Sequence, residues 1–251
     1  TRQVADSFVS RGIPAEKIHI APNAVDIDKF VQVPKDSDFA RKIGLSEDLL
    51  TLGFAGSVVE YEGLNLLLEA SHALESRGIA HQVAIAGTGS GLSVLKDQAE
   101  ALGMKNVHFL GRLPQDDIPR LLSVFDIVVC PRLDTKITQL VSPLKPLESF
   151  SAGRATVLSD VDPHVDLAGR NAARAALFPT GNAEALANTL ETLMQDADRR
   201  RGLEREARLW VKRERTWEVV GKGVYDLIRR ACGRRSRALQ PVRNLSDLRI
   251  G

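Results

Sequence analysis

The sequence predicts an α/β protein built on a doubly wound, Rossmann-like parallel sheet. Short runs of almost continuous apolar residues recur along the chain, and most of them end at glycine or proline. Segments with leucines at helical spacing lie between these runs. Strands that are apolar on both faces need helices on both faces, and right-handed crossovers follow from that arrangement. Ligands of such sheets bind at the carboxyl ends of the strands.

The elements follow in order. Apolar runs predict strands at residues 18–21, 50–55, 82–86, 107–110, 125–130, 155–158 and 175–178. Helical spacing predicts helices near residues 64–74, 92–102, 118–122, 144–150, 186–193, 199–213 and 217–231. No repeat of fixed period and no low-complexity tract interrupts the pattern. Residues 232–251 lack periodicity and are predicted to be a tail or linker.

Composition restricts the class of protein. The 251 residues suit one large or two small domains, and 43% apolar with 26% charged residues is typical of a soluble globular chain. The two cysteines, Cys130 and Cys232, are too far apart in sequence for a CxxC site, which favours a reducing cytoplasm. No apolar run has the ~18–20 residues that span a bilayer. The first residue is Thr1, so we expect a piece of a longer protein.

Arginines concentrate late in a chain whose formal net charge is only +2. The simpler interpretation is a solvated helix face with i,i+4 ion pairs, because Glu204, Glu206 and Glu214 interleave with them. The alternative is peripheral contact with an anionic membrane, which would place a cytoplasmic protein at the inner face of the membrane. Aromatic residues do not interleave with these cations, which argues against nucleic acid as a partner.

Glycine opens several loops at the predicted binding edge of the sheet. The run Gly87-Thr88-Gly89-Ser90-Gly91 is not a dinucleotide fingerprint, since that spacing needs glycine where the chain has Leu92. Glycine still lets the backbone approach a ligand closely. The five histidines show no metal-ligand spacing, so we predict no metal site. A nucleophile elbow and a P-loop are both missing from the sequence, which argues against a hydrolase or an NTPase.

Residues 141–148 (VSPLKPLE) are the most informative segment. Its prolines stand where a helix begins, so the amides of Leu144 and Lys145 and the charge of Lys145 suit an anion. Glu148, one turn further on, could accept hydrogen bonds from two ribose hydroxyls, or simply form a surface pair with Lys145. Arg132 follows the strand at 125–130 on the same edge, and with Lys145 it could clamp a diphosphate.

These motifs together resemble the C-terminal, donor-binding lobe of family-4 retaining glycosyltransferases (glycosyl transferases group 1). The resemblance covers residues 1 to 231, and it depends on several weak motifs in the right order. They are PNAVD at residues 22–26 with Phe30, FAGS at 54–57 with EGL at 62–64, FLGRL at 109–113, SPLKPLE at 142–148 with SAG at 151–153, and Trp217.

The resemblance implies one lobe of a GT-B fold, a UDP- or GDP-type sugar donor, retained configuration and no metal or other cofactor. It implies that Gly111, Arg112 and Leu113 contact the base, Glu148 the ribose, and the amides of Leu144 and Lys145 the phosphates. The catalytic assignment falls on Lys145, Arg132 and Glu148. The binding assignment falls on Gly56, Ser57, Gly87, Gly111, Arg112, Leu113, Ser142, Leu144, Lys145 and Glu148.

The resemblance also divides the chain. Residues 1–14 are expected to be a remnant of a missing N-terminal, acceptor-binding lobe. Residues 15–215 form the nucleotide-sugar-binding domain, and residues 216–231 a helix that crosses back to the missing lobe.

Three positions depart from the family pattern. Leu140 stands where the first of two paired acids is expected, and Ser57 and Glu62 stand where two cations near the diphosphate are expected. One interpretation is a subgroup that takes its charge from Arg132 and Lys145. The other is a non-catalytic nucleotide-sugar-binding or assembly module.

Overall fold

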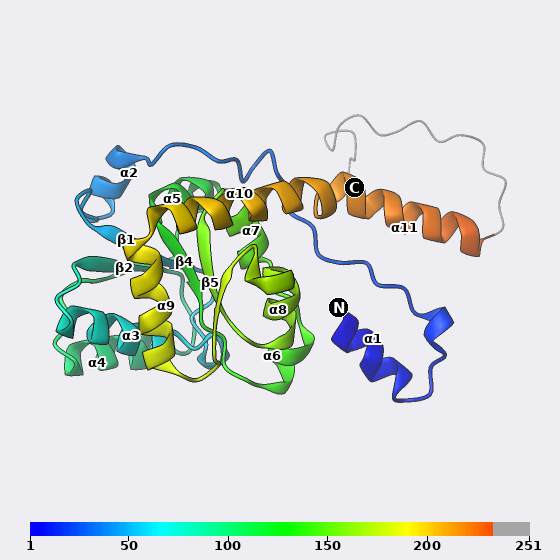
Figure 1. Cartoon of the computed structure of the whole chain (residues 1–251), viewed down its shortest axis with the longest axis horizontal. Helices are drawn as coiled ribbons and strands as arrows, with labels where there is room; N and C mark the ends of the chain where they lie inside the picture. The colour runs from blue at the N-terminus through cyan, green and yellow to red at the C-terminus, as the bar shows by residue number, and fades with distance from the viewer. Residues whose placement is uncertain (233–251) are drawn as a thin grey trace.

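The computed structural model describes residues 1–232 and contains a six-stranded, wholly parallel sheet (Figure 1). The strand order is β3-β2-β1-β4-β5-β6, so the chain winds outward in one direction as far as β3 and in the other from β4. The doubly wound Rossmann-like sheet is therefore confirmed. The strands are β1 (Leu50–Ala55), β2 (His81–Ala86), β3 (Val107–Gly111), β4 (Ile127–Cys130), β5 (Ala155–Ser159) and β6 (Ala176–Phe178).

Helices connect these strands and cover both faces of the sheet. The α-helices are α1 (Arg2–Val9), α2 (Ser37–Lys42), α3 (Leu64–Ser76), α4 (Leu92–Ala101), α5 (Ile118–Val124), α6 (Lys136–Leu140), α7 (Lys145–Ser151), α8 (Asp162–Ala168), α9 (Ala183–Gln195), α10 (Ala197–Glu214) and α11 (Trp217–Ala231). Single turns of 3-10 helix occupy Ala15–Lys17, Glu60–Glu62, Gln115–Asp117 and Arg170–Ala172.

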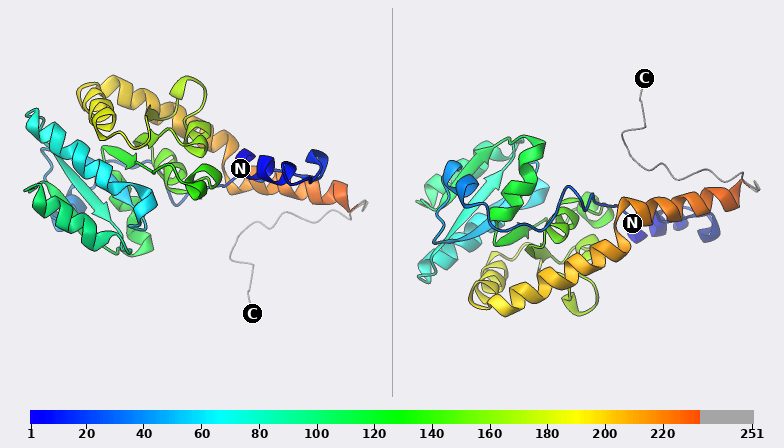
Figure 2. Two further views of the ribbon diagram at one scale, coloured as in Figure 1. Left: turned by 90° about the horizontal axis from the view of Figure 1, so that it is seen from below. Right: turned by 90° about the horizontal axis from the view of Figure 1, so that it is seen from above.

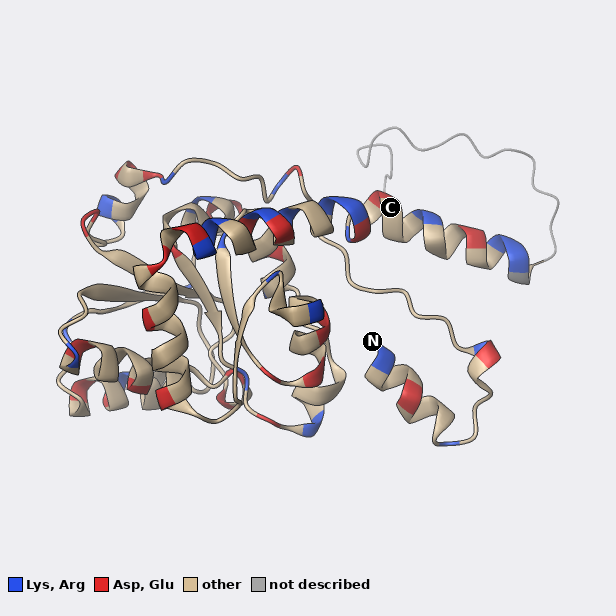
Figure 3. Ribbon diagram, in the orientation of Figure 1, with Lys and Arg blue, Asp and Glu red and all other residues tan. Residues whose placement is uncertain are grey.

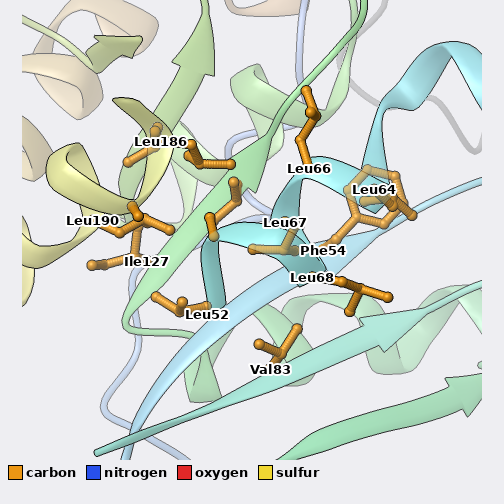
Figure 4. Packing of buried hydrophobic residues seen from close by; sticks show 14 of the residues in the cluster. Leu52, Phe54, Leu64, Leu66, Leu67, Leu68, Val83, Ile127, Leu186 and Leu190 are labelled. Carbon is orange, nitrogen blue, oxygen red and sulfur yellow. The ribbon is translucent and has the colours of Figure 1, made fainter. Parts of the chain in front are cut away.

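Two buried apolar clusters lie on the two faces of the sheet. Figure 4 shows part of the first, in which Leu52 and Phe54 of β1 pack with leucines of α3 and α9. The second packs β2, β4 and β5 against α5, α7 and α10, with Phe125 and Phe150 among its fully buried side chains. Alternate residues of one strand therefore serve opposite faces, as a buried parallel sheet requires.

Trp210 of α10 belongs to the second cluster. Its ring meets Phe150 edge-on, with 6.3 Å between the ring centroids. The guanidinium groups of Arg174 and Arg215 lie 4.2 and 4.6 Å from the centroid of the Trp210 ring. This cation–π arrangement fastens α10 to the sheet where the chain turns toward α11.

Two helices project from the sheet on one side (Figure 2). Neither α1 nor residues 217–230 of α11 bury a single side chain. Both helices nevertheless carry apolar faces, with Phe8 and Val9 exposed near the end of α1 and Trp217 and Ile228 exposed on α11. An apolar helix face left in water is typical of a surface that another element covers.

The sequence placed most elements correctly and missed a few. The strand predicted at residues 18–21 is wrong, because that segment is coil with no neighbouring strand, and Ile20 lies exposed. The short helices α2, α6 and α8, of five to seven residues, were not predicted. The predicted tail, residues 232–251, lies outside the described residues apart from Cys232.

Candidate functional site

A cleft of about 630 Å³ opens at the carboxyl edge of the sheet, where the order of the strands reverses. Loops after β1, β2 and β3 form its walls together with the first turn of α7. The lining residues are Phe30, Ala55, Gly56, Ser57, Ala86, Gly87, Thr88, Arg112, Leu113, Pro114, Gln115, Ile118, Leu144, Lys145 and Glu148. Most of the binding residues proposed from the sequence are therefore brought together.

The floor of the cleft is bare backbone. Gly56 and Gly87 have φ angles of 154° and 139°, which side-chain-bearing residues rarely adopt. A Cβ on Gly87 would lie 1.7 Å from the carbonyl oxygen of Gly56. The Gly56 amide donates to the Ala86 carbonyl at 2.9 Å, and the Gly87 amide donates to the Gly111 carbonyl at 2.7 Å. The three loops are thus held together by main-chain bonds that leave room above them for a ligand.

Lys145 is one of two cations that line this cleft, the other being Arg112. Lys145 is the first residue of α7, and its aliphatic chain crosses Gly56 so closely that a Cβ there would lie 2.0 Å from Lys145 Cε. Its Nζ lies 2.8 Å from Glu62 Oε1 and 5.3 Å from the centroid of the Phe54 ring. About 20% of the side chain remains exposed. The ammonium group is therefore fixed in direction but still reachable from the cleft.

Glu62 is a site residue whose role sequence reasoning missed. Its side chain is only 2% exposed, and Oε1 accepts from Arg132 Nη2 at 3.0 Å as well as from Lys145. Burial pushes the pKa of the carboxyl upward, but the Arg132 hydrogen bond and the charges of Lys145 and Arg132 outweigh it. The pKa of Glu62 is lowered as a result, and the group is a carboxylate at neutral pH.

Arg132 lies behind the cleft and does not line its wall. It is 7% exposed, with Nη1 donating to the Val141 carbonyl at 3.1 Å and Nη2 to Glu62. Its guanidinium also lies 6.0 Å from the centroid of the Tyr61 ring. The structure therefore does not show Arg132 and Lys145 facing each other as a clamp; it shows both cations meeting on one carboxylate.

Glu148 stands on the same wall as Lys145, one helical turn further on. Burial raises the pKa of its carboxyl, although the charges of Lys145 and Lys29 act in the opposite direction. Lys145 pairs with Glu62 and not with Glu148, so the alternative interpretation of Glu148 as the partner of Lys145 in a surface pair is wrong. Within residues 1–232 no side chain donates a hydrogen bond to the Glu148 carboxylate. That leaves its oxygens available to accept from hydroxyl groups in the cleft.

The remaining predicted residues do not all line the cleft. Ser57, Arg112, Leu113 and Leu144 line the cleft, and Gly111 lies just outside its lining. Ser142 instead lines a second cavity of about 440 Å³, between α1 and the segment that joins α6 to α7. Leu140 lines that second cavity too.

The described part of the chain holds no group of three or more His, Cys, Asp or Glu side chains placed to bind a metal ion. None of its helices has both the length and the apolar character that crossing a bilayer requires.

Comparison with known proteins agrees with this geometry. Residues 36–210 match the family described as "Glycosyl transferases group 1". The D-rhamnosyltransferase WbpZ of Pseudomonas aeruginosa is 40% identical over 78 residues, which are 31% of this chain and 19% of that protein. The chain spans between 19% and 55% of the length of five curated relatives that it matches.

Solved structures share the fold at low sequence identity. Anabaena HepE in complex with UDP-glucose superposes with a TM-score of 0.79 at 19% identity, over 89% of this chain and 60% of that one. The C-terminal domain of the group 1 protein LpcC from Francisella tularensis has a TM-score of 0.64 at 16% identity, over 76% of this chain and 98% of that domain.

The matched residues comprise the whole sheet, most of the helices that cover it, and every residue that lines the cleft except Phe30. The chain is a member of the glycosyl transferases group 1 family, with the Rossmann-like architecture of GT-B enzymes.

Proposed function

We propose that the cleft binds the nucleoside diphosphate of a UDP- or GDP-sugar, and that this chain is the donor-binding lobe of a retaining glycosyltransferase. The observation that carries the proposal is that Lys145 and Glu148 both line one wall of a cleft whose floor is formed by glycines at the sheet edge. An ammonium suits the diphosphate and an unpartnered carboxylate suits the ribose hydroxyls. HepE, which shares the fold, was solved with UDP-glucose bound.

The chemistry assigned to the site is stabilisation of a leaving group. As the glycosidic bond to the donor sugar breaks, negative charge grows on the departing diphosphate. A cation that is already oriented stabilises that charge without reorganising. Lys145 is in that state, since Glu62, Gly56 and Phe54 fix its chain. We expect the backbone amides of Leu144 and Lys145 to add to it, and we assign no metal ion or other cofactor to the step.

The acceptor, a glycan or a lipid-linked molecule, is assigned to a separate N-terminal lobe. The exposed apolar faces of α1 and α11 support this assignment, because they offer a second domain a place to pack. In the proposed organisation residues 1–14 and 216–231 belong with that lobe, and residues 15–215 form the donor-binding domain. The LpcC fragment, described as a C-terminal domain, has the same fold.

The proposed location is the cytoplasm. The basic residues of α10 alternate with acidic ones (Figure 3), and Arg201, Arg205 and Arg213 each pair with a carboxylate of their own helix. These contacts favour a solvated face over a membrane-binding one. Sedimentation with phosphatidylglycerol vesicles tests the alternative; binding lost at high salt would favour a place at the inner face of the membrane.

A non-catalytic nucleotide-sugar-binding or assembly module is the second candidate. Leu140 favours it, because an apolar side chain stands where the resemblance leads us to expect a carboxylate, and it lines a different cavity from Lys145. Incubating the full-length protein with UDP- and GDP-sugars and a suitable acceptor extract separates the two candidates. Binding of a donor without transfer or hydrolysis would favour the module.

Calorimetric titration with UDP and with GDP tests the binding proposal directly. We expect Lys145→Ala to weaken binding by about 1–3 kcal/mol, the range for a hydrogen bond to a charged group. Lys222→Ala is the matched control, since Lys222 is exposed on α11. Equal affinity of the Lys145→Ala variant and the unaltered chain would contradict the proposal.

A further inference from the structure

Three charged side chains from separate segments meet behind the cleft. Glu62 ends the 3-10 turn that follows β1, Arg132 follows β4, and Lys145 begins α7. Both cations reach the same oxygen, Glu62 Oε1, at 3.0 and 2.8 Å. We call Glu62, Arg132 and Lys145 the charge cluster.

The charge cluster is graded from buried to accessible. Exposed fractions of the side chains are 2% for Glu62, 9% for Arg132 and 20% for Lys145. Only Lys145 of these three lines the cleft. A ligand in the cleft can therefore touch Lys145 but not Arg132, whose guanidinium contacts Glu62 instead.

Arg132 determines the net charge of the charge cluster. A Lys145–Glu62 pair alone would be neutral, and a neutral pair attracts a diphosphate weakly. Arg132 restores a net charge of +1 to the cluster and satisfies the second oxygen of Glu62 through Nε, at 3.4 Å. A buried carboxylate held by one lysine alone would otherwise compete with the ligand for that lysine.

Backbone contacts hold the buried half of the charge cluster in place. A Cβ on Gly63, next to Glu62, would lie 2.1 Å from the Pro131 carbonyl oxygen, next to Arg132. The Leu133 amide donates to the Tyr61 carbonyl at 3.0 Å. Arg132 also holds the Val141 carbonyl, in the segment that leads to α7. The Glu62–Arg132 pair is thus connected to the segment that leads to α7, whose first residue is Lys145.

We propose that Arg132 is a positioning residue that acts through Glu62: it neutralises the buried carboxylate, so that Lys145 keeps its positive charge for the diphosphate. The inference rests on the proposed function, because it assigns the ligand of Lys145 to that class. It gives Glu62 a role at a position where the family resemblance leads one to expect a cation.

The test is a charge series titrated with UDP, GDP and inorganic pyrophosphate in calorimetry. Arg132→Met brings the net charge of the charge cluster to zero and should weaken binding of these ligands about tenfold or more. Arg132→Lys keeps the charge but loses the two-pronged contact with Glu62, and should bind more tightly than Arg132→Met. The double variant Glu62→Gln/Arg132→Met again carries +1 and should recover most of the lost affinity.

A merely structural role for Arg132 predicts that affinity falls only where stability falls, so the melting temperature of each variant is measured beside its affinity. Affinity that is lost in a variant with an unchanged melting temperature supports the proposal. Arg132→Met leaves a buried carboxylate without its main partner and can fail to fold, which circular dichroism will show. In that case the folded double variant decides: affinity near that of the unaltered chain supports the proposal, and a tenfold loss overturns it.

The outcomes separate the inference from the proposed function. UDP or GDP binding that Arg132→Met leaves unchanged overturns the inference alone. Pyrophosphate binding that follows the charge series, without nucleotide binding, overturns the proposed function alone. An unaltered chain that binds none of the three ligands overturns both.

Discussion

The cleft and the two projecting helices, α1 and α11, differ in how far their side chains are buried and paired. At the cleft, Glu62 and Arg132 are buried and paired, and the apolar Phe54 is fully buried beneath Lys145. On α11, 62% of Trp217 is exposed and its helix buries no side chain in residues 217–230. The first region is complete within the described chain, whereas the second presents an apolar face without a partner. Preorganisation therefore marks the binding site, and unburied apolar area marks the docking surface that we propose.

Truncating one aromatic residue in each region gives the largest contrast. Phe54→Ala should destabilise the chain by about 3–5 kcal/mol, because it removes a fully buried ring from under Lys145. Trp217→Ala should change the free energy of unfolding by less than about 0.5 kcal/mol. Urea unfolding followed by circular dichroism measures both. Similar losses of unfolding free energy for the two variants would mean that α11 is packed against protein in solution. The contrast between the cleft and α11 would then be wrong.

The same glycine substitution should have opposite signs in the two regions. Gly87→Ala forces a Cβ toward the Gly56 carbonyl in a strained backbone conformation, so a loss of about 1–3 kcal/mol is expected. Gly221→Ala lies within α11 with no atom in the way, and should stabilise that helix by about 0.5–1 kcal/mol. Thermal melts recorded at 222 nm distinguish them. A destabilising Gly221→Ala would show that the face of α11 is already in contact with protein.

Glu148→Gln should give the smallest change in stability, and the size of that change depends on pH. Burial raises the pKa of Glu148 in the folded chain, so the folded state holds the proton more tightly than the unfolded state. Stability contributed by this group therefore falls as pH rises from the ordinary value of 4.5 through the raised value.

The variant should consequently melt slightly higher than the unaltered chain at pH 7.5 and at the same temperature at pH 4, while binding UDP more weakly. Differential scanning calorimetry at the two pH values checks the first part, and titration with UDP the second. A melting-temperature difference that is the same at both pH values would contradict the assignment of the shift to Glu148.

The sequence predicted the sheet well because its evidence is local. The apolar run of β1 was placed at its observed bounds, and the glycines after β1 and β2 marked two of the loops that line the cleft. The segment 18–21 has the composition of a strand but no neighbour to pair with, and pairing cannot be read from composition. The sequence could not predict that the Arg132 side chain points at Glu62, because the two residues are 70 positions apart in sequence.

The two tryptophans of this protein, Trp210 and Trp217, lie in different surroundings and should fluoresce at different wavelengths. Trp210 is 9% exposed between two guanidinium groups, whereas Trp217, seven positions later, stands in water. A shielded indole emits at shorter wavelength than a hydrated one, so the two contributions to the emission spectrum are separable. Association at α11 should shift the emission of Trp217 to the blue and leave Trp210 unchanged, while melting of the sheet should shift Trp210 to the red. Tryptophan fluorescence alone can thus distinguish binding of a partner at α11 from unfolding of the sheet.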